Sequence, residues 1–237
     1  MQKSLAGVII MMFLLLLSCA EREDLAPVVD SKWREYNSKK TKHTVQAGET
    51  LYAIAFRYDK DYQTLAEINH LKSPYTLKIG QVVSLHPKVQ VKGARIHKKP
   101  VLKKTAKQEP KPIGFNGQWQ WPVQGKIHST FAPWKGRKGV NITGRKGEKI
   151  RAAAGGIVAY SGNGLPGYGN LIIIKHNNQF LTAYGNNSTT YVKEGQVIKP
   201  GQVIARMGKV ERKYWGLHFE IRKSGKPVNP LIYLKKA

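Results

Sequence analysis

The spacing of apolar residues between positions 43 and 85 predicts a small module built on two helices. One apolar helical stripe has the i, i+3, i+4, i+7 spacing and consists of Leu51, Ile54, Ala55 and Tyr58. Thr50 precedes that stripe as a helix N-cap, and Asp61 is placed to cap a second helix. β-prone residues flank the two helices at 44–45 and 82–85. The module is therefore predicted to have the order β-α-α-β.

The apolar pattern changes downstream of residue 117. Short β-prone runs are separated by glycines and turn residues, and they lie at 126–131, 149–153, 156–160, 170–175, 180–184, 203–207 and 217–222. This spacing predicts an antiparallel sheet or sandwich. The run GNLIIIKH at 169–176 is expected to be the most buried of these strands. The chain is thus predicted to be mainly β, with one small α+β module.

Two segments without such patterns divide the chain. Residues 87–116 are basic and contain prolines, which predicts an extended linker because like charges repel and proline stiffens the backbone. Residues 19–42 are mixed in charge and poor in large apolar groups, which predicts a tether. The folded units are then expected at 43–86 and at 117–235.

The N-terminus has the pattern of an export signal. Lys3 precedes an almost wholly apolar run at 5–17, which is too short to span a bilayer as a helix. The run ends in Leu-Leu-Ser-Cys, which resembles a bacterial lipobox. The resemblance implies that residues 1–18 are a lipoprotein signal peptide and that Cys19, the only cysteine, is lipidated. The alternative is an incidental cysteine in an ordinary signal peptide.

The residue after this cysteine is Ala20 and not Asp. By the sorting rule of such lipoproteins, the implied location is the outer membrane, with the lipid anchor facing the periplasm. The formal net charge of +26, from 40 basic and 14 acidic side chains, favours an anionic partner. An exported lipoprotein does not meet nucleic acid, which leaves lipid head groups and the carboxylates of wall peptides. A solvated basic surface explains the charge equally well.

The motifs of the first module resemble the LysM family. VQAGETLYAIA, LAEINHL and LKIGQVVSL follow one another at the spacing of that family. The resemblance implies a shallow groove for N-acetylglucosamine-containing glycans, with peptidoglycan glycan strands as the partner. The implied groove residues are Gly48, Glu49, Thr50, Leu51, Ser73, Leu77 and Ile79. Free backbone donors at a helix N-terminus suit acetamido carbonyls; in the alternative, Thr50 only caps the helix and Leu51 only fills the core.

The motifs of the second domain resemble the LytM, or lysostaphin-like, zinc metallopeptidases. WPVQGKI, KGVNI, LTAY and LHFEIR carry the resemblance, together with the glycine-rich stretch at 150–176. Active members hold zinc with a His and an Asp in one motif and with the second His of a His-x-His strand, while two further histidines assist the bound water. Three protein ligands leave the fourth zinc position open for that water.

Most of those positions hold other residues in this chain. The first His position holds Arg137 and the Asp position holds Asn141, while Asn186 and Gly216 replace the assisting histidines and only His218 remains. A complete zinc site contributes about 10–16 kcal/mol, and one imidazole beside a permanent guanidinium charge supplies little of it. We therefore predict no bound metal, no cofactor, no catalytic residue and no hydrolase activity.

A cleft without its metal is expected to be polar, basic and edged by aromatic rings. Its predicted contact residues are Arg137, Asn141, Tyr168, Tyr184, Asn186, Gly216, His218 and Arg222. A LysM module followed by a degenerate LytM domain on a lipoprotein resembles the NlpD-type and YgeR-type activators of periplasmic N-acetylmuramoyl-L-alanine amidases. The resemblance implies that the degenerate domain binds such an amidase and relieves its autoinhibition during cell-wall hydrolysis and daughter-cell separation.

Two alternatives stay open at this point. One is a cryptic zinc endopeptidase of peptidoglycan cross-links that recruits His128 or His176 as a ligand. The other is a passive wall-binding tether whose C-terminal domain only holds glycan or stem peptide.

Overall fold

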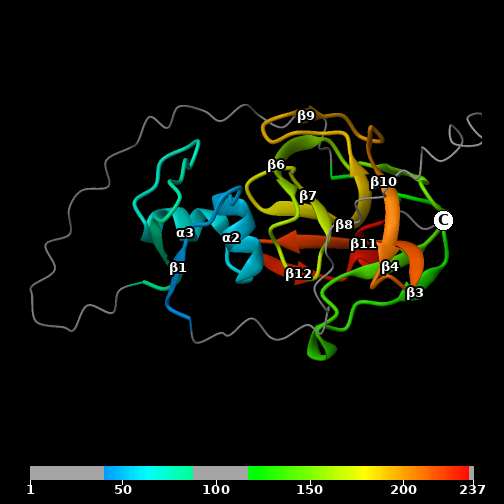
Figure 1. The fold of residues 1–237 in the computed structure, drawn as a ribbon, viewed down its shortest axis with the longest axis horizontal. Helices are drawn as coiled ribbons and strands as arrows, with labels where there is room; N and C mark the ends of the chain where they lie inside the picture. Colours follow the sequence, from blue (N-terminus) through cyan, green and yellow to red (C-terminus); the bar gives the residue numbers. More distant parts are fainter. Residues whose placement is uncertain (1–39, 88–116, 235–237) are drawn as a thin grey trace, which may run out of the picture.

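The computed structural model describes residues 40–87 and 117–234, which form two folded units (Figure 1). The predicted signal peptide with Cys19, most of the predicted tether and most of the predicted basic linker lie outside the described residues. Within the two described ranges, no helix is long and apolar enough to cross a membrane.

The N-terminal unit confirms the predicted β-α-α-β order. Its elements are β1 (Lys42–Thr44), α2 (Leu51–Arg57), α3 (Tyr62–Ile68) and β2 (Val82–Ser84). β1 and β2 pair in an antiparallel ladder. The predicted helix caps are present, because Thr50 Oγ1 accepts a hydrogen bond from the N–H of Ala53 at 3.1 Å and Asp61 Oδ2 accepts one from Thr64 at 3.0 Å.

The C-terminal unit confirms the predicted antiparallel sheet. Its strands are β3 (Ile127–Ser129), β4 (Val140–Thr143), β5 (Lys149–Arg151), β6 (Gly156–Gly162), β7 (Asn170–Lys175), β8 (Phe180–Thr190), β9 (Val197–Ile198), β10 (Val203–Val210), β11 (Tyr214–Lys223) and β12 (Lys226–Val228). The strand order is β3-β4-β11-β10-β8-β7-β6-β9, with β5 beside β10 and β12 beside β11. A 3-10 helix η1 (Pro133–Lys135) precedes β4, and a short helix α4 (Pro230–Tyr233) follows β12.

β11 runs through the middle of the sheet and sends alternate side chains to its two faces. The residues that enter the main apolar core are Leu217, Phe219 and Ile221. His218, Glu220 and Arg222 therefore point to the opposite face. On the neighbouring strands, His218 lies opposite Asn141 of β4 and opposite Gly185 of β8.

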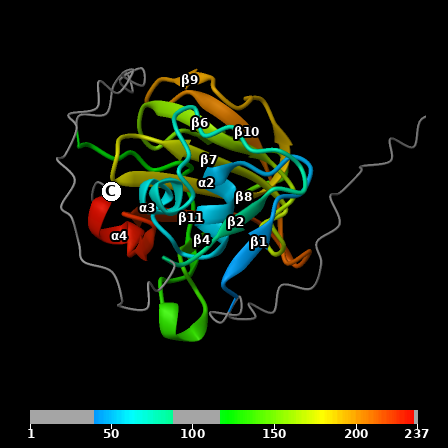
Figure 2. The ribbon, with the colours of Figure 1, turned by 90° about the vertical axis from the view of Figure 1, so that its left-hand side faces the viewer.

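The N-terminal unit covers part of this second face, which the sequence did not predict. Phe56 of α2 shares an apolar cluster with Tyr168, Leu171 and Ile173. Figure 1 shows α2 against one end of the sheet, and in Figure 2 α2 lies in front of β7, β8 and β11. β7 is thus buried on both faces, which explains why its sequence is a continuous apolar run.

Candidate functional site

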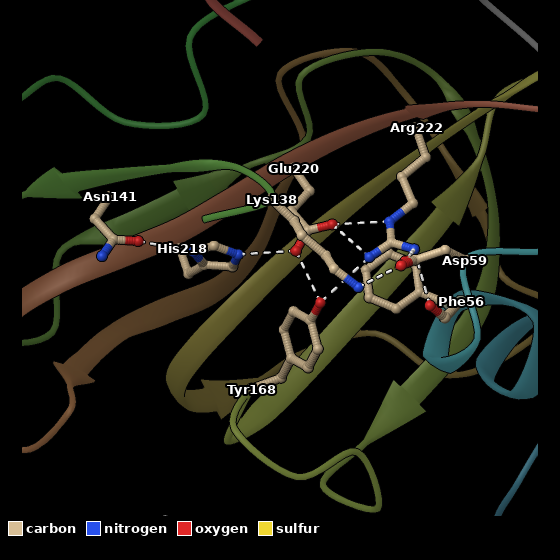
Figure 3. Close-up of polar contacts among 8 residues, drawn as sticks. All are labelled: Phe56, Asp59, Lys138, Asn141, Tyr168, His218, Glu220 and Arg222. Atoms are coloured by element: carbon tan, nitrogen blue, oxygen red, sulfur yellow. Dashed lines mark hydrogen bonds and ion pairs between the residues drawn. The ribbon is translucent and has the colours of Figure 1, made fainter. Parts of the chain in front are cut away.

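Of the three positions where the family holds zinc ligands, Asn141 lies on β4 and His218 on β11, while Arg137 lies in the loop before β4. His218 Nδ1 lies 2.7 Å from Asn141 Oδ1, and His218 Nε2 lies 3.0 Å from Glu220 Oε1. Asn141 also donates from Nδ2 to the hydroxyl of Tyr214 at 3.1 Å. Both ring nitrogens of the one remaining histidine are therefore occupied by side chains of the domain itself (Figure 3).

These residues do not fit a zinc ion. The guanidinium of Arg137 stands where the family uses an imidazole, and the amide of Asn141 stands where it uses a carboxylate. Both ring nitrogens of His218 are hydrogen-bonded to side chains, so neither is left to coordinate a metal. Among residues 40–87 and 117–234, no group of three His, Cys, Asp or Glu side chains lies close enough to hold a metal ion. No chemical step that needs a metal follows from this arrangement.

A buried acid–base pair lies next to the remaining histidine. Glu220 Oε2 accepts hydrogen bonds from the Arg222 guanidinium at 2.8 Å, and Glu220 Oε1 accepts one from the Tyr168 hydroxyl at 2.8 Å. Burial raises the pKa of Glu220, but the Arg222 charge and the hydrogen bond with His218 outweigh that effect and hold the pKa at about 2. Glu220 is therefore a carboxylate whose acceptor sites are already used inside the protein.

The same guanidinium connects the sheet to the N-terminal unit. Arg222 Nη1 donates to the backbone carbonyl of Phe56 at 2.8 Å and to Asp59 Oδ1 at 2.6 Å, and the guanidinium lies 3.5 Å above the centroid of the Phe56 ring. Lys138, from the loop before β4, donates to Asp59 Oδ2 at 2.5 Å. The partner of these cleft cations is thus the LysM module of the same chain (Figure 3).

Three predicted cleft residues need correction. Tyr184 is fully buried on the core face, where its hydroxyl accepts hydrogen bonds from the N–H of Ala153 at 2.8 Å and from Thr182 Oγ1 at 3.0 Å. It lies opposite Phe219 in the β8–β11 ladder, so strand alternation directs both rings into the core. Tyr168 and Arg222 do lie on the cleft face, but they are buried against α2 and do not edge an open groove.

The other predicted cleft residues differ in how accessible they are. Asn186 is 7% exposed and holds a backbone φ of 63°. Gly216 is buried within β11, where an added Cβ would lie 3.0 Å from the Ile142 carbonyl oxygen. Arg137 is half-buried, and its Nε is buried without a hydrogen-bond acceptor among the described residues. Arg137 is therefore partly accessible as a residue, although its buried Nε is not.

The two histidines that a cryptic zinc site would recruit make contacts of their own. His176 is buried on the core side, 5.0 Å from the Trp119 ring, and hydrogen-bonds with the Gly155 carbonyl and Thr182 Oγ1, each at 2.7 Å. Burial lowers the pKa of His176 to about 4. His128 packs on the Tyr214 ring with the two centroids 4.1 Å apart. Neither histidine joins a metal-binding group with His218.

The predicted glycan residues fall into buried and open positions. Leu51 is 1% exposed in the LysM core, and the Glu49 carboxylate is paired with His43 at 2.6 Å and with Arg57 at 2.8 Å. Thr50 caps α2 and also donates from Oγ1 to the Ala159 carbonyl of the other unit at 3.1 Å. The residues that remain accessible are Gly48 and Ser73, which are exposed, Ile79, which is 75% exposed, and Leu77, which is half-buried.

Two exposed aromatic residues were missed by the sequence reasoning. Trp134 of η1 is 78% exposed, and Tyr191, just after β8, is 49% exposed. Each precedes a turn-prone polar run, KGRKG after Trp134 and VKEGQ after Tyr191. An aromatic residue directly before a turn sequence is the signal that could have identified them, because a turn holds its residues at the surface.

The fold and the site define a class of protein: a LysM module joined to a metallopeptidase-like domain in which two of the three metal-ligand positions hold other residues. A LysM domain model matches residues 43–85, and a model of peptidase family M23 matches residues 135–230. The chain belongs to the NlpD/LppB family of lipoproteins, because its similarity to members of that family extends across both units.

Three relatives illustrate the extent of the similarity. The lipoprotein NlpD/LppB homolog of Pseudomonas aeruginosa is 38% identical over 228 residues, which cover 82% of this chain and 77% of the relative. The murein hydrolase activator NlpD of Escherichia coli is 35% identical over 254 residues, with coverages of 81% and 67%. Outer membrane antigenic lipoprotein B of Haemophilus influenzae is 33% identical over 270 residues, with coverages of 87% and 67%.

Proposed function

We propose that this chain is a non-catalytic lipoprotein that binds peptidoglycan through its LysM module and activates a periplasmic N-acetylmuramoyl-L-alanine amidase through its M23-type domain. The observation that carries the proposal is the filled cleft. His218, the one metal-ligand residue that remains, is hydrogen-bonded to Asn141 and Glu220. Glu220 is bound in turn to Tyr168 and Arg222, so both side chains serve as structural partners. An M23 fold with such a cleft is suited to binding rather than to hydrolysis.

The relatives support this proposal through their names. One is named a murein hydrolase activator and another an outer membrane lipoprotein. The lipobox-like sequence ending at Cys19 supports an anchor in the outer membrane, with the folded units in the periplasm. These names and the anchor fit a protein that controls an enzyme acting on the cell wall.

The surface most suited to the amidase lies at the rim of the cleft, because the inner cleft residues contact the LysM module. The loop that carries η1 is closed by two hydrogen bonds between the backbones of Ala132 and Arg137, at 2.9 and 3.1 Å. It presents Trp134 to solvent, with the half-buried Arg137 beside it. Trp and Arg are the residue types that most often dominate protein interfaces.

The proposal is tested with dye-labelled sacculi, a purified amidase from the same cell and the full-length protein. The protein is expected to raise the rate of dye release by the amidase, and Trp134→Ala is expected to lower that stimulation about tenfold. Arg137→Ala should lower it less. Ile232→Ala, which removes a side chain of α4 that is 77% exposed, is the matched control and should retain full stimulation.

Two results would contradict the proposal. If no amidase of the cell is stimulated, the chain is a passive wall-binding tether. If Trp134→Ala and Arg137→Ala both stimulate as well as the unsubstituted protein, the rim of the cleft is not the amidase-binding surface.

A further inference from the structure

A cavity lies at the junction of the two units, on the side of the LysM module that carries Gly48. Its volume is about 690 Å³, and it is lined by Ala47 and Gly48 of the LysM module and by segments 160–164 and 190–194 of the M23-type domain. It is separate from the former zinc cleft, because neither Asn141 nor His218 lines it. An open cavity shared by two units is a common place for ligand binding.

The walls of this cavity are fixed by hydrogen bonds. Across the junction, Thr50 Oγ1 donates to the Ala159 carbonyl at 3.1 Å and Arg57 Nη2 donates to the Gly164 carbonyl at 2.7 Å. Within the M23-type domain, Ser161 Oγ donates to the Val192 carbonyl at 2.9 Å and so joins the two lining segments. The lining is therefore already ordered before a ligand binds, so binding does not cost the conformational entropy of ordering it.

Tyr191 gives this cavity an aromatic surface. Its ring is 49% exposed, and its hydroxyl accepts a hydrogen bond from Arg206 Nε at 2.5 Å. Arg206 is itself held by the Gly147 carbonyl at 2.9 Å, so the ring position is set by the domain. A fixed, exposed tyrosine ring offers an apolar face to a flat ligand while its hydroxyl stays bonded to Arg206.

The remaining lining is polar and suits a ligand rich in hydroxyl and amide groups. Asn163, Lys193 and Glu194 are exposed and line the cavity, so they offer an amide, an ammonium and a carboxylate. One exposed ring with a few polar groups around it is the combination expected for the apolar face and polar edge of a sugar. The mixture of both charges does not favour a simple anion.

The position of Gly48 indicates which sugar polymer fits. Gly48 lines the cavity and belongs to the LysM loop that is expected to hold N-acetylated glycans. A Cβ atom added at Gly48 would meet nothing within 4 Å, so a chain can pass over this residue. We propose that the junction cavity is a second subsite for the same glycan strand, which continues from the LysM groove over Gly48 onto the Tyr191 ring.

This inference rests on the proposed binding of glycan by the LysM module, and it adds a dependence on chain length. A short N-acetylglucosamine oligomer fills only the LysM groove, whereas a longer oligomer also reaches Tyr191. Linking two subsites in one ligand raises the affinity without any change in the first subsite. The full-length protein should therefore bind the octamer of N-acetylglucosamine about tenfold more tightly than the trimer.

Calorimetric titration of both oligomers tests the subsite. Tyr191→Ala is expected to remove the advantage of the octamer and to leave the affinity for the trimer unchanged. Asn163→Ala, an exposed substitution in the other lining segment, should reduce the advantage by a smaller factor. Ile79→Ala, in the LysM groove, should weaken both oligomers equally, and Ile232→Ala should change neither.

The failures of the two proposals are distinguishable. If the protein binds trimer and octamer equally, and Tyr191→Ala and Asn163→Ala change neither, the junction subsite is wrong while glycan binding by the LysM module stands. Equal weakening of both oligomers by Tyr191→Ala also overturns the subsite. If the unsubstituted protein binds no oligomer, glycan binding by the LysM module is itself wrong, and the subsite with it.

Discussion

The predicted glycan loops of the LysM module and the cleft of the M23-type domain at the zinc-ligand positions differ in how their polar groups are used. Gly48, Ser73 and Ile79 of the loops remain exposed. In the cleft, Glu220 and Arg222 are both fully buried; they bind each other, and Arg222 also binds Asp59. The cleft of the M23-type domain, where two metal ligands are replaced, is therefore filled by buried polar side chains that bind one another and the N-terminal unit.

Electrostatics explains this difference. A buried carboxylate or guanidinium is very costly without a partner, whereas exposed backbone and apolar groups in a loop carry no such cost. The Glu220–Arg222 pair has a third charged partner in Asp59 of the LysM module. The charge balance of the cleft therefore depends on the docking of the two units, while the glycan loops do not depend on the cleft.

The largest expected effect comes from removing the central cation of the cleft. Arg222→Met is expected to lower the free energy of unfolding by about 3–5 kcal/mol, because Glu220 is left buried without its main partner. Urea unfolding measures the loss. Lys226→Met, which removes an exposed cation of β12, is the control and should change stability by less than about 0.5 kcal/mol.

A second substitution sharpens this prediction. Glu220→Gln in the Arg222→Met background should recover part of the lost stability, since it removes the uncompensated charge. If Arg222→Met lowers the free energy of unfolding no more than Lys226→Met does, the Glu220–Arg222 pair does not stabilise the fold. The contrast between the cleft, whose polar groups are paired, and the exposed loops would then be wrong.

Acid should weaken the cleft over a defined pH range. The pKa of Glu220 is lowered from 4.5 to about 2 in the folded chain, so its contribution is fully present above the unfolded value and is lost as the pH falls through the folded value. The loss between these two pH values should approach roughly 3 kcal/mol. Urea unfolding at a series of pH values measures it, and a Glu220→Gln variant should lack this part of the pH dependence.

A smaller effect is expected from the contact between the units. Asp59 binds both Arg222 and Lys138, but its side chain is 30% exposed, so Asp59→Asn should cost only about 1 kcal/mol. Its clearer result should be faster hydrogen exchange of amides in α2 and β7, which lie at the interface. Glu67→Gln, on the exposed side of α3, is the matched control and should leave those rates unchanged. Unchanged exchange in Asp59→Asn would show that this ion pair does not hold the units together.

Local patterns allowed much of the fold to be predicted. The caps at Thr50 and Asp61 follow from neighbours in sequence, and the structure confirms them. The placement of Tyr184 at the cleft was wrong because strand alternation was not applied to β8, where Thr182 and Tyr184 share the core face. The same period-2 rule would have directed Tyr184 inward.

The docking of the two units could not be predicted from local patterns. Asp59 and Arg222 are 163 residues apart in the chain, and neither has a neighbour that marks it as a long-range partner. Phe56 reads as one more apolar residue of a helix, although it packs on Tyr168 of the other unit, with ring centroids 5.3 Å apart. The junction cavity depends on this docking, so it was also beyond the reach of the sequence.

The products released from unlabelled sacculi test the central claim most directly, which is that an M23 fold here controls an amidase instead of cutting the wall itself. Sacculi are incubated with the full-length protein alone, with amidase alone and with both, in zinc-containing buffer, and the soluble fragments are identified by mass spectrometry. We predict no fragments from the protein alone and, from the pair, more stem peptides cut at the muramoyl–alanine bond than from amidase alone, with cross-links intact. Cleaved cross-links from the protein alone, or no gain from the pair, would contradict the account.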